Sequence, residues 1–215
     1  MLTYKDETVK DSLEVFDQCA DLPASFWGFK DVGLPKSDMK RLVKRMKESG
    51  KATFLEVVSL TEMECLDGAR LALDCGFDYL MGTVFYHSVF ELMKGKHTKF
   101  FPFAGKVSGH PSILGGTISE ILADGRRMEE LGVAGFDLLA YRYVGDAQAL
   151  AASFVEGVHV PVVLAGSIDG FPRLDSVKRI APWAFTIGSA FFDRKFVPGG
   201  TFREQIVKVL DYLKS

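Results

Sequence analysis

Two Gly-Ser pairs lie near the ends of two late apolar stretches of the sequence. The first pair is Gly166-Ser167 and the second is Gly188-Ser189. Glycine leaves backbone N–H groups accessible to an anion, and the serine hydroxyls add further donors. We therefore expect these four residues to bind a phosphate group. The simpler alternative is that both glycines only permit tight turns between a strand and a helix.

An acid–base group precedes these turns in the chain. Lys30 and Asp31 end an apolar stretch, and Glu56 lies inside another, Leu55-Glu56-Val57-Val58-Ser59. A buried carboxylate without a partner is costly, so we expect Glu56 to pair with Lys30 on the neighbouring strand. Lys30, Asp31 and Glu56 are our catalytic candidates, because such a group can move a proton or polarise a carbonyl. Structural ion pairs at the barrel rim are the alternative for all three.

Two further segments carry candidate ligand-binding residues. Tyr141 and Arg142 follow a later apolar stretch, and their phenol and guanidinium suit a carboxylate or a second oxyanion of a substrate. An ion pair of Arg142 with Asp146 is the alternative. A glycine-rich segment over 105–116 contains Lys106, a substrate-binding candidate, and His110, a catalytic acid or base candidate. A surface histidine is the alternative for His110.

Metal and cofactor signals are weak. The sequence contains no dinucleotide fingerprint, Walker loop or Cys-His zinc spacing. We therefore assign no metal ligands and no definite cofactor, although Asp31, Glu56 and Asp169 could hold a divalent cation by residue type alone. Asp137, Trp27 and Trp183 begin their predicted strands, so we expect them at the stability face of the fold and assign them no chemistry.

The elements that must position these residues follow a regular alternation of strand and helix. Strands are expected at 2–4, 26–31, 52–59, 77–82, 99–104, 136–141, 160–166 and 183–189. Helices are expected at 8–19, 37–49, 61–75, 84–94, 118–131, 146–156, 172–180 and 202–214. Eight such units predict a single α/β domain over 1–215, an eight-stranded (β/α)8 TIM barrel whose chemistry lies where the strands end. The glycine-rich segment over 105–116 is expected to be a loop at that face.

Composition restricts the partners. The formal net charge of −2 gives no general attraction to nucleic acid or to an anionic membrane, so a nucleic-acid partner is not expected. The basic stretch 36–47 has helical spacing, which indicates a solvated outer face of a helix. The N-terminus lacks a secretory pattern, and we expect a cytoplasmic protein. A phosphorylated small molecule is the expected ligand, and a homo-oligomer is left open.

Several motifs together resemble a known family. They are 28–33 (GFKDVG), 55–59 (LEVVS), 109–111 (GHP), 137–142 (DLLAYR), 165–167 (AGS) and 185–190 (FTIGSA). Over nearly the whole chain the sequence is similar to a ribulose-phosphate-binding barrel family of bacteria, whose members are often labelled 4-hydroxythreonine-4-phosphate dehydrogenase. This resemblance implies a TIM barrel of the ribulose-phosphate-binding type.

Three functions remain open at this stage. The first is an enzyme, of lyase, isomerase or epimerase type, that performs proton-transfer or carbonyl chemistry on a phosphorylated metabolite. Lys30-Asp31 resembles part of the orotidine-phosphate decarboxylase pattern, but the fuller Asp-x-Lys-x-x-Asp motif is missing. The second is a phosphometabolite sensor that binds RNA, because 50–56 resembles the glycerol-phosphate-responsive antiterminator barrels. The third is the dehydrogenase of the family label.

Overall fold

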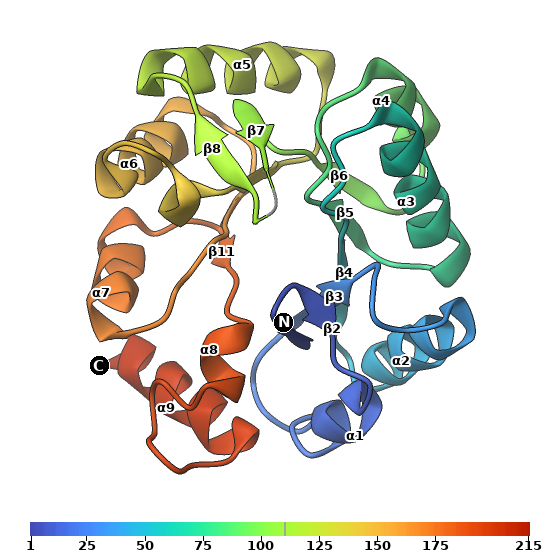
Figure 1. Ribbon diagram of the computed structural model, residues 1–215, viewed down its shortest axis with the longest axis vertical. Helices are drawn as coiled ribbons and strands as arrows, with labels where there is room; N and C mark the ends of the chain where they lie inside the picture. The colour runs from blue at the N-terminus through green and yellow to red at the C-terminus, as the bar shows by residue number, and fades with distance from the viewer. Residues whose placement is uncertain (110) are drawn as a thin grey trace.

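Eight strands form the barrel in this computed structural model, which describes residues 1–109 and 111–215. The barrel strands are β1 (Thr3–Tyr4), β3 (Phe26–Lys30), β4 (Ala52–Glu56), β5 (Tyr79–Met81), β6 (Lys99–Phe101), β9 (Phe136–Leu138), β10 (Val162–Leu164) and β11 (Ala184–Phe185). Eight helices follow them: α1 (Ser12–Asp17), α2 (Lys36–Glu48), α3 (Glu62–Cys75), α4 (His87–Met93), α5 (Ile118–Leu131), α6 (Ala147–Gly157), α7 (Phe171–Ile180) and α9 (Phe202–Lys214). Figure 1 shows these helices as a ring around the strands, which confirms the predicted (β/α)8 fold.

Backbone hydrogen bonds close the barrel. Strands β3, β4, β5 and β6 form one parallel sheet, and β9, β10 and β11 form another. A parallel bridge between Phe103 and Asp137 joins the two sheets on one side. On the other side the N-terminal segment lies between them, because Leu2 N donates to Gly28 O (2.8 Å) and Met1 N donates to Ile187 O (2.8 Å). The N-terminal segment therefore closes the barrel at the seam between β3 and β11.

One end of the barrel interior is filled by apolar side chains. Phe54, Met81, Phe101 and Val163 pack together there. The Trp183 ring adds a further contact 5.6 Å from the Phe101 ring, which confirms the prediction that Trp183 lies at the stability face. Because apolar side chains line this end, the polar interior groups lie at the end where the strands finish.

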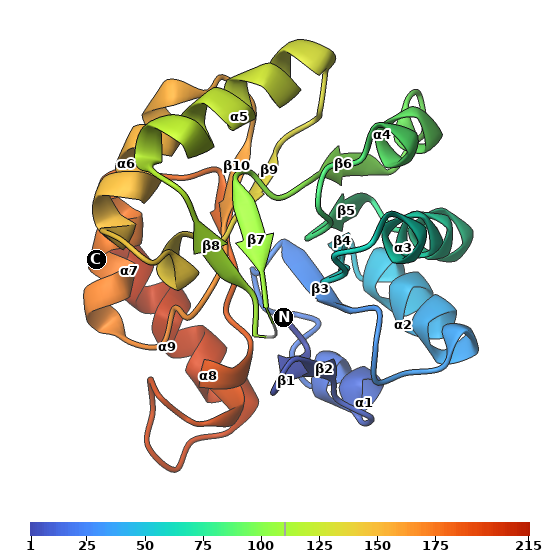
Figure 2. The ribbon, with the colours of Figure 1, turned by 45° about the horizontal axis from the view of Figure 1, so that its top comes forward.

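The glycine-rich segment, predicted as a loop at the strand-end face, contains two short strands on either side of residue 110 that the sequence did not predict. Strands β7 (Lys106–Ser108) and β8 (Ile113–Gly115) pair antiparallel. Val144 N donates to Leu114 O (3.1 Å), and Tyr143 Oη donates to Gly116 O (2.9 Å), so the hairpin is fastened to the segment after β9. Figure 2 shows it extending across the barrel mouth toward the N-terminal strands.

Three other short elements were not predicted. Strand β2 (Glu7–Thr8) pairs with β1, a 3-10 helix η1 (Ala140–Arg142) follows β9, and α8 (Ser189–Phe192) follows β11. Each overlaps the end of a predicted strand or helix by one or two residues. Among the described residues, no helix is both long enough and apolar enough to cross a membrane.

Candidate active site

A cavity of about 340 Å³ lies at the ends of the strands, and we name it the mouth pocket. Lys30, Glu56 and Arg142 line one part of it. Both Gly-Ser pairs, Gly166-Ser167 and Gly188-Ser189, line it as well. The structure thus brings the predicted phosphate residues and the predicted acid–base residues into one cavity. Ser112, close to the hairpin tip, also lines the pocket with a buried hydroxyl that has no hydrogen-bond partner among the described residues.

Lys30 is the centre of an ion-pair network. Its Nζ lies 2.7 Å from Asp6 Oδ1 and 3.8 Å from Glu56 Oε1, and its side chain is only 7% exposed. Lys30 and Glu56 are partners in the register of β3 and β4, which confirms that the two side chains share the inward face. Arg142 Nη2 lies 3.5 Å from the same Asp6 oxygen, so Asp6 links both cations.

The sequence interpretation missed Asp6. It lies in the turn between β1 and β2, where Lys5 and Asp6 have φ values of 49° and 66°. Two consecutive left-handed residues are typical of the tight hairpin turn that joins antiparallel strands, and aspartate tolerates this conformation. The short alternating segment Thr3-Tyr4-Lys5-Asp6-Glu7-Thr8 carried that signal. The turn directs a carboxylate over the barrel mouth.

Asp137 lies in the barrel interior, where the charges of Glu56 and Lys30 act on it, so the prediction that it lies at the stability face is wrong. It is fully buried in the middle of β9, and neither carboxylate oxygen has a hydrogen-bond partner among the described residues. Burial raises the pKa of Asp137 well above its usual range, and the Glu56 charge raises it further, whereas Lys30 and Arg142 oppose the shift. The site therefore holds one carboxylate in an ion pair, Glu56, and one buried acid that favours its protonated form.

Asp31 does not join this group. It is absent from the lining of the mouth pocket, and its backbone N donates to Glu56 O (3.3 Å). Burial raises the pKa of Asp31 to about 6, with smaller upward contributions from Glu56 and Glu64 and a downward one from Lys30. Since successive strand residues point to opposite faces, Lys30 faces the barrel interior and the adjacent Asp31 does not.

The raised pKa of Asp31 predicts a pH-dependent gain in stability from Asp31→Asn. The contribution of Asp31 to stability is lost as pH rises from about 4 to about 6, because the folded state holds this proton more tightly than the unfolded chain. The asparagine variant escapes that loss, so relative to wild type it should gain about 2 kcal/mol between pH 4 and pH 8. Urea unfolding at both pH values measures the difference.

The matched control is Asp67→Asn, whose side chain is 68% exposed on α3. It is expected to change the free energy of unfolding by less than about 0.5 kcal/mol at either pH. Equal effects of the two substitutions would contradict the placement of Asp31.

The two glycines of the Gly-Ser turns have close neighbours. Gly166 has φ +115°, and a Cβ there would lie 3.2 Å from the Tyr141 Cβ. A Cβ on Gly188 would lie 3.0 Å from Thr3 O. Ser189 Oγ accepts a hydrogen bond from Lys5 N (3.1 Å). The two glycines thus allow the chain to approach Tyr141 and Thr3 closely at the edge of the pocket. Tight turns and phosphate binding are compatible roles for the same glycines.

One cation near these turns was not predicted. Lys195 lines the mouth pocket together with the acids Asp169 and Asp193. Its backbone N donates to Ala190 O (3.0 Å), which folds the segment after α8 back toward the second Gly-Ser turn. No sequence signal pointed to Lys195, which lies in a short charged segment without helix or strand periodicity. The fold brings it to the pocket.

The other predicted binding residues lie apart. The Tyr141 ring packs under the Arg173 guanidinium of α7 (5.2 Å), outside the pocket lining, and burial raises the pKa of its phenol. Lys106 is exposed on β7 and interacts with the Glu120 charge. Neither residue is brought into the mouth pocket. His110 lies outside the described residues.

Arg142 and Asp146 do not form the ion pair that was the alternative for Arg142. Asp146 accepts hydrogen bonds from Gln148 N and Ala149 N (both 3.0 Å) as the N-cap of α6, while Arg142 turns to Asp6. Asp169, a possible metal ligand by residue type, pairs with Arg173 (3.1 Å). Within residues 1–109 and 111–215, no group of three or more His, Cys, Asp or Glu side chains could hold a metal ion.

Comparisons with known proteins show the fold. No family model and no curated protein matches the chain. The chain is similar to solved structures of N-(5'-phosphoribosyl)anthranilate isomerase from Pyrococcus furiosus (TM-score 0.61, 12% identity, covering 97% of this chain and 96% of that one) and N-acetylmannosamine-6-phosphate 2-epimerase from Clostridium perfringens (0.58, 14%, 97% and 89%). Orotidine 5'-phosphate decarboxylase from Lactobacillus acidophilus also matches (0.55, 11%, 87% and 86%). The protein is a (β/α)8 barrel with a polar pocket at the ends of its strands.

Proposed function

We propose that the protein is an enzyme that transfers a proton next to a carbonyl group of a small phosphorylated metabolite, in a lyase or isomerase type of reaction. One observation carries the proposal: the two Gly-Ser turns and the Lys30–Glu56 pair line the same 340 Å³ cavity. A phosphate held at Gly166–Ser167 and Gly188–Ser189 leaves the rest of a short carbon chain beside the acid–base group.

The side chains suggest separate roles. Glu56 accepts or returns a proton, and Lys30 polarises the carbonyl oxygen or exchanges a proton with it. Arg142, held by Asp6, binds an anionic group at the other end of the substrate. Asp137, buried behind the pair, favours its neutral form and so adds no second negative charge beside Glu56. These steps need only side chains of this protein and no added cofactor.

The names of the matched structures are compatible with this proposal. The three enzymes named above are an isomerase, an epimerase and a decarboxylase, and each name contains a phosphorylated compound. The resemblance to the ribulose-phosphate-binding barrels points to the same substrate class.

Proton exchange in D2O tests the proposed chemistry. A pool of phosphorylated aldoses and ketoses is incubated with the protein, and proton NMR follows exchange of the hydrogen next to the carbonyl. The wild-type protein should catalyse exchange in at least one compound, and Glu56→Gln should reduce the rate about 100-fold or more. A wild-type protein that exchanges none of them contradicts the proposal. Borohydride treatment with the active compound then decides whether Lys30 forms a Schiff base, since only that version leaves an adduct on Lys30.

Phosphate binding predicts a specific effect of Gly166→Ala. The substitution puts a side chain at φ +115° and against Tyr141, so the turn must move. We expect the affinity for inorganic phosphate, measured by calorimetry, to fall about tenfold or more, with a stability loss of about 1 kcal/mol.

Gly132→Ala is the matched control, because Gly132 has φ +98° and open space around its Cβ position at the end of α5. It should cost similar stability and leave phosphate affinity unchanged. If both variants weaken phosphate binding equally, the turn at Gly166 is not the binding site.

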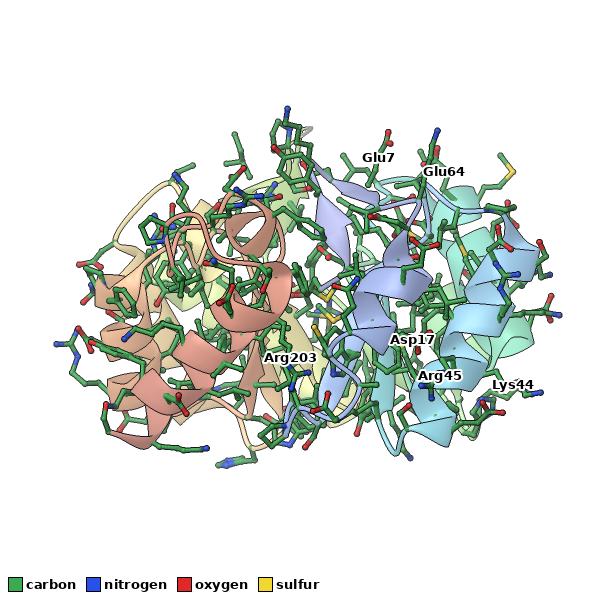
Figure 3. All side chains as sticks on the ribbon, turned by 90° about the horizontal axis from the view of Figure 1, so that it is seen from below. Glu7, Asp17, Lys44, Arg45, Glu64 and Arg203 are labelled. Carbon is green, nitrogen blue, oxygen red and sulfur yellow. The ribbon has the colours of Figure 1, made fainter. Side chains whose placement is uncertain are left out.

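The RNA-binding alternative depends on the basic residues of α2, and the structure shows acids beside most of them. Lys36 pairs with Asp74, Arg41 with Asp38, Lys44 with Glu48, Arg45 with Asp17 and Lys47 with Asp78. Arg45 Nε lies 2.7 Å from Asp17 Oδ1 at the end of helix α1. Figure 3 shows these two residues next to each other. These pairs reduce the positive potential that a phosphate backbone needs. We therefore favour the enzyme over the RNA-binding sensor.

The dehydrogenase of the family label is the third candidate. The names of the matched structures reported above give it no support. It predicts a change in nicotinamide absorbance when the protein, NAD(P) and phosphorylated alcohols are mixed, whereas the proposed reaction predicts none.

A further inference from the structure

A second cavity of about 140 Å³ lies next to the mouth pocket, and we name it the apolar chamber. Phe54, Met81 and Val163 line it from inside the barrel. Ile206, Val209 and Leu213 line it from α9, outside the strands. No charged side chain contributes to the lining. The chamber therefore joins the barrel interior to the layer under α9.

The chamber lies at a seam of the barrel where two of the described strands are not paired directly with each other. Strands β3 and β11 are not paired with each other in the described sheets, and the N-terminal segment joins them through the hydrogen bonds of Met1 and Leu2. Small residues border this seam: Gly28 on β3 and Ala184 on β11 both line the chamber. A Cβ on Gly28 would lie 2.9 Å from Met1 Sδ, so the Met1 side chain occupies the space that a larger residue would fill.

The apolar chamber and the mouth pocket have two lining residues in common. Met1 and Thr186 line both cavities. Thr186 is two residues before Gly188, so the shared wall lies directly beside the second Gly-Ser turn. A phosphate at that turn therefore lies beside residues that also line the chamber.

The physical character of the two cavities differs sharply. The mouth pocket contains ion pairs and hydroxyl groups, which hold water or a polar ligand well. The lining of the apolar chamber is mostly apolar, and apolar cavities of this size accept small apolar molecules. An empty chamber also costs stability, which an apolar occupant would recover.

We propose that the substrate or ligand of the mouth pocket is amphipathic: a phosphate ester whose small apolar group, of the size of one aromatic ring or a short branched chain, enters the apolar chamber past Met1 and Thr186. The inference rests on the proposed phosphate site and narrows the substrate class from sugar phosphates in general to esters with an apolar end. Burial of the apolar group adds affinity that a purely polar phosphate ester lacks.

Calorimetry with three probes of rising apolar content tests this inference: inorganic phosphate, methyl phosphate and 2-phenylethyl phosphate. The wild-type protein should bind 2-phenylethyl phosphate about tenfold or more tightly than methyl phosphate. Val209→Phe fills the chamber from α9 and should remove this preference while leaving inorganic phosphate affinity unchanged. Val207→Phe adds the same atoms on the same helix at a site 37% exposed to solvent, and should keep the preference.

The outcomes separate the inference from the proposed function. Equal affinity of the wild type for methyl and 2-phenylethyl phosphate, with inorganic phosphate bound, overturns the amphipathic ligand and leaves the phosphate site standing. Absence of binding by all three probes overturns both. If Val209→Phe fails to fold, Leu213→Phe is the replacement, and a crystal structure with 2-phenylethyl phosphate decides independently: a ring between Val163 and Val209 supports the chamber, and a ring in solvent overturns it.

Discussion

Replacing Lys30 by methionine is expected to reduce proton exchange of the substrate about 100-fold or more and to lower the free energy of unfolding by about 3 kcal/mol. Methionine keeps most of the side-chain volume but removes the charge that pairs with Asp6 and Glu56. Both carboxylates are then left without this cation in a barrel interior, and removing one partner of a buried ion pair is strongly destabilising. Deuterium exchange and urea unfolding measure the two effects.

Two further variants separate the causes. Combining Lys30→Met with Glu56→Gln also removes the negative charge that Lys30→Met leaves unpaired at Glu56. The double variant should therefore recover part of the lost stability but none of the activity. Lys44→Met removes a lysine that is 78% exposed on α2 and should change stability by less than about 0.5 kcal/mol. A Lys30→Met protein with wild-type exchange rates would remove Lys30 from the proposed mechanism.

Asp137→Asn is expected to stabilise the protein increasingly as pH rises. The pKa of Asp137 is raised in the folded state, chiefly by burial, so the wild type is most stable relative to the variant below about pH 4. It loses that stability as pH rises from the unfolded pKa of about 4 to the raised folded pKa, because the folded state keeps the proton that the unfolded chain releases. Asparagine has nearly the same shape and stays neutral. The gain at pH 8 relative to pH 4 should be about 2 kcal/mol or more, because the pKa of Asp137 is raised well above its usual range.

Asp137→Asn is also expected to alter catalysis. If ionisation of Asp137 at high pH puts a second negative charge beside Glu56, the asparagine variant removes that ionisation and changes the high-pH side of the pH profile of proton exchange, whereas a purely structural residue would leave the shape of that profile unaltered. Thermal and urea unfolding over pH 4–8 measure the change in stability between the variant and the wild type. A variant less stable than the wild type by the same amount at every pH would contradict the buried-acid interpretation.

Periodicity was sufficient to predict the fold. Helices α5 (Ile118–Leu131) and α9 (Phe202–Lys214) begin and end where the sequence pattern placed them. Both begin at a capping box, in which Thr117 pairs with Glu120 and Thr201 pairs with Glu204, so the local signal and the apolar period agree. The Lys30–Glu56 pair was predicted for a similar reason, since neighbouring parallel strands put their terminal residues side by side.

The missed residues depend on contacts that no local pattern encodes. Asp137 was assigned to the stability face because a strand was expected to run to Tyr141, but β9 ends at Leu138. The bridge between Asp137 and Phe103 instead places Asp137 beside the residues that follow β6, near the strand ends. The same early end gives the 3-10 helix η1, which turns Tyr141 toward Arg173 and Arg142 toward Asp6. Asp6 itself comes from a hairpin turn more than 130 residues away in the chain.

The location of a bound phosphate tests the central claim most directly. A crystal structure of the protein with inorganic phosphate, and then with a phosphorylated ketose that shows proton exchange, should place the phosphorus between Gly166–Ser167 and Gly188–Ser189. The ketose carbonyl should lie within hydrogen-bond distance of Lys30 Nζ. A phosphate bound elsewhere, or a carbonyl directed away from Lys30 and Glu56, would contradict the account.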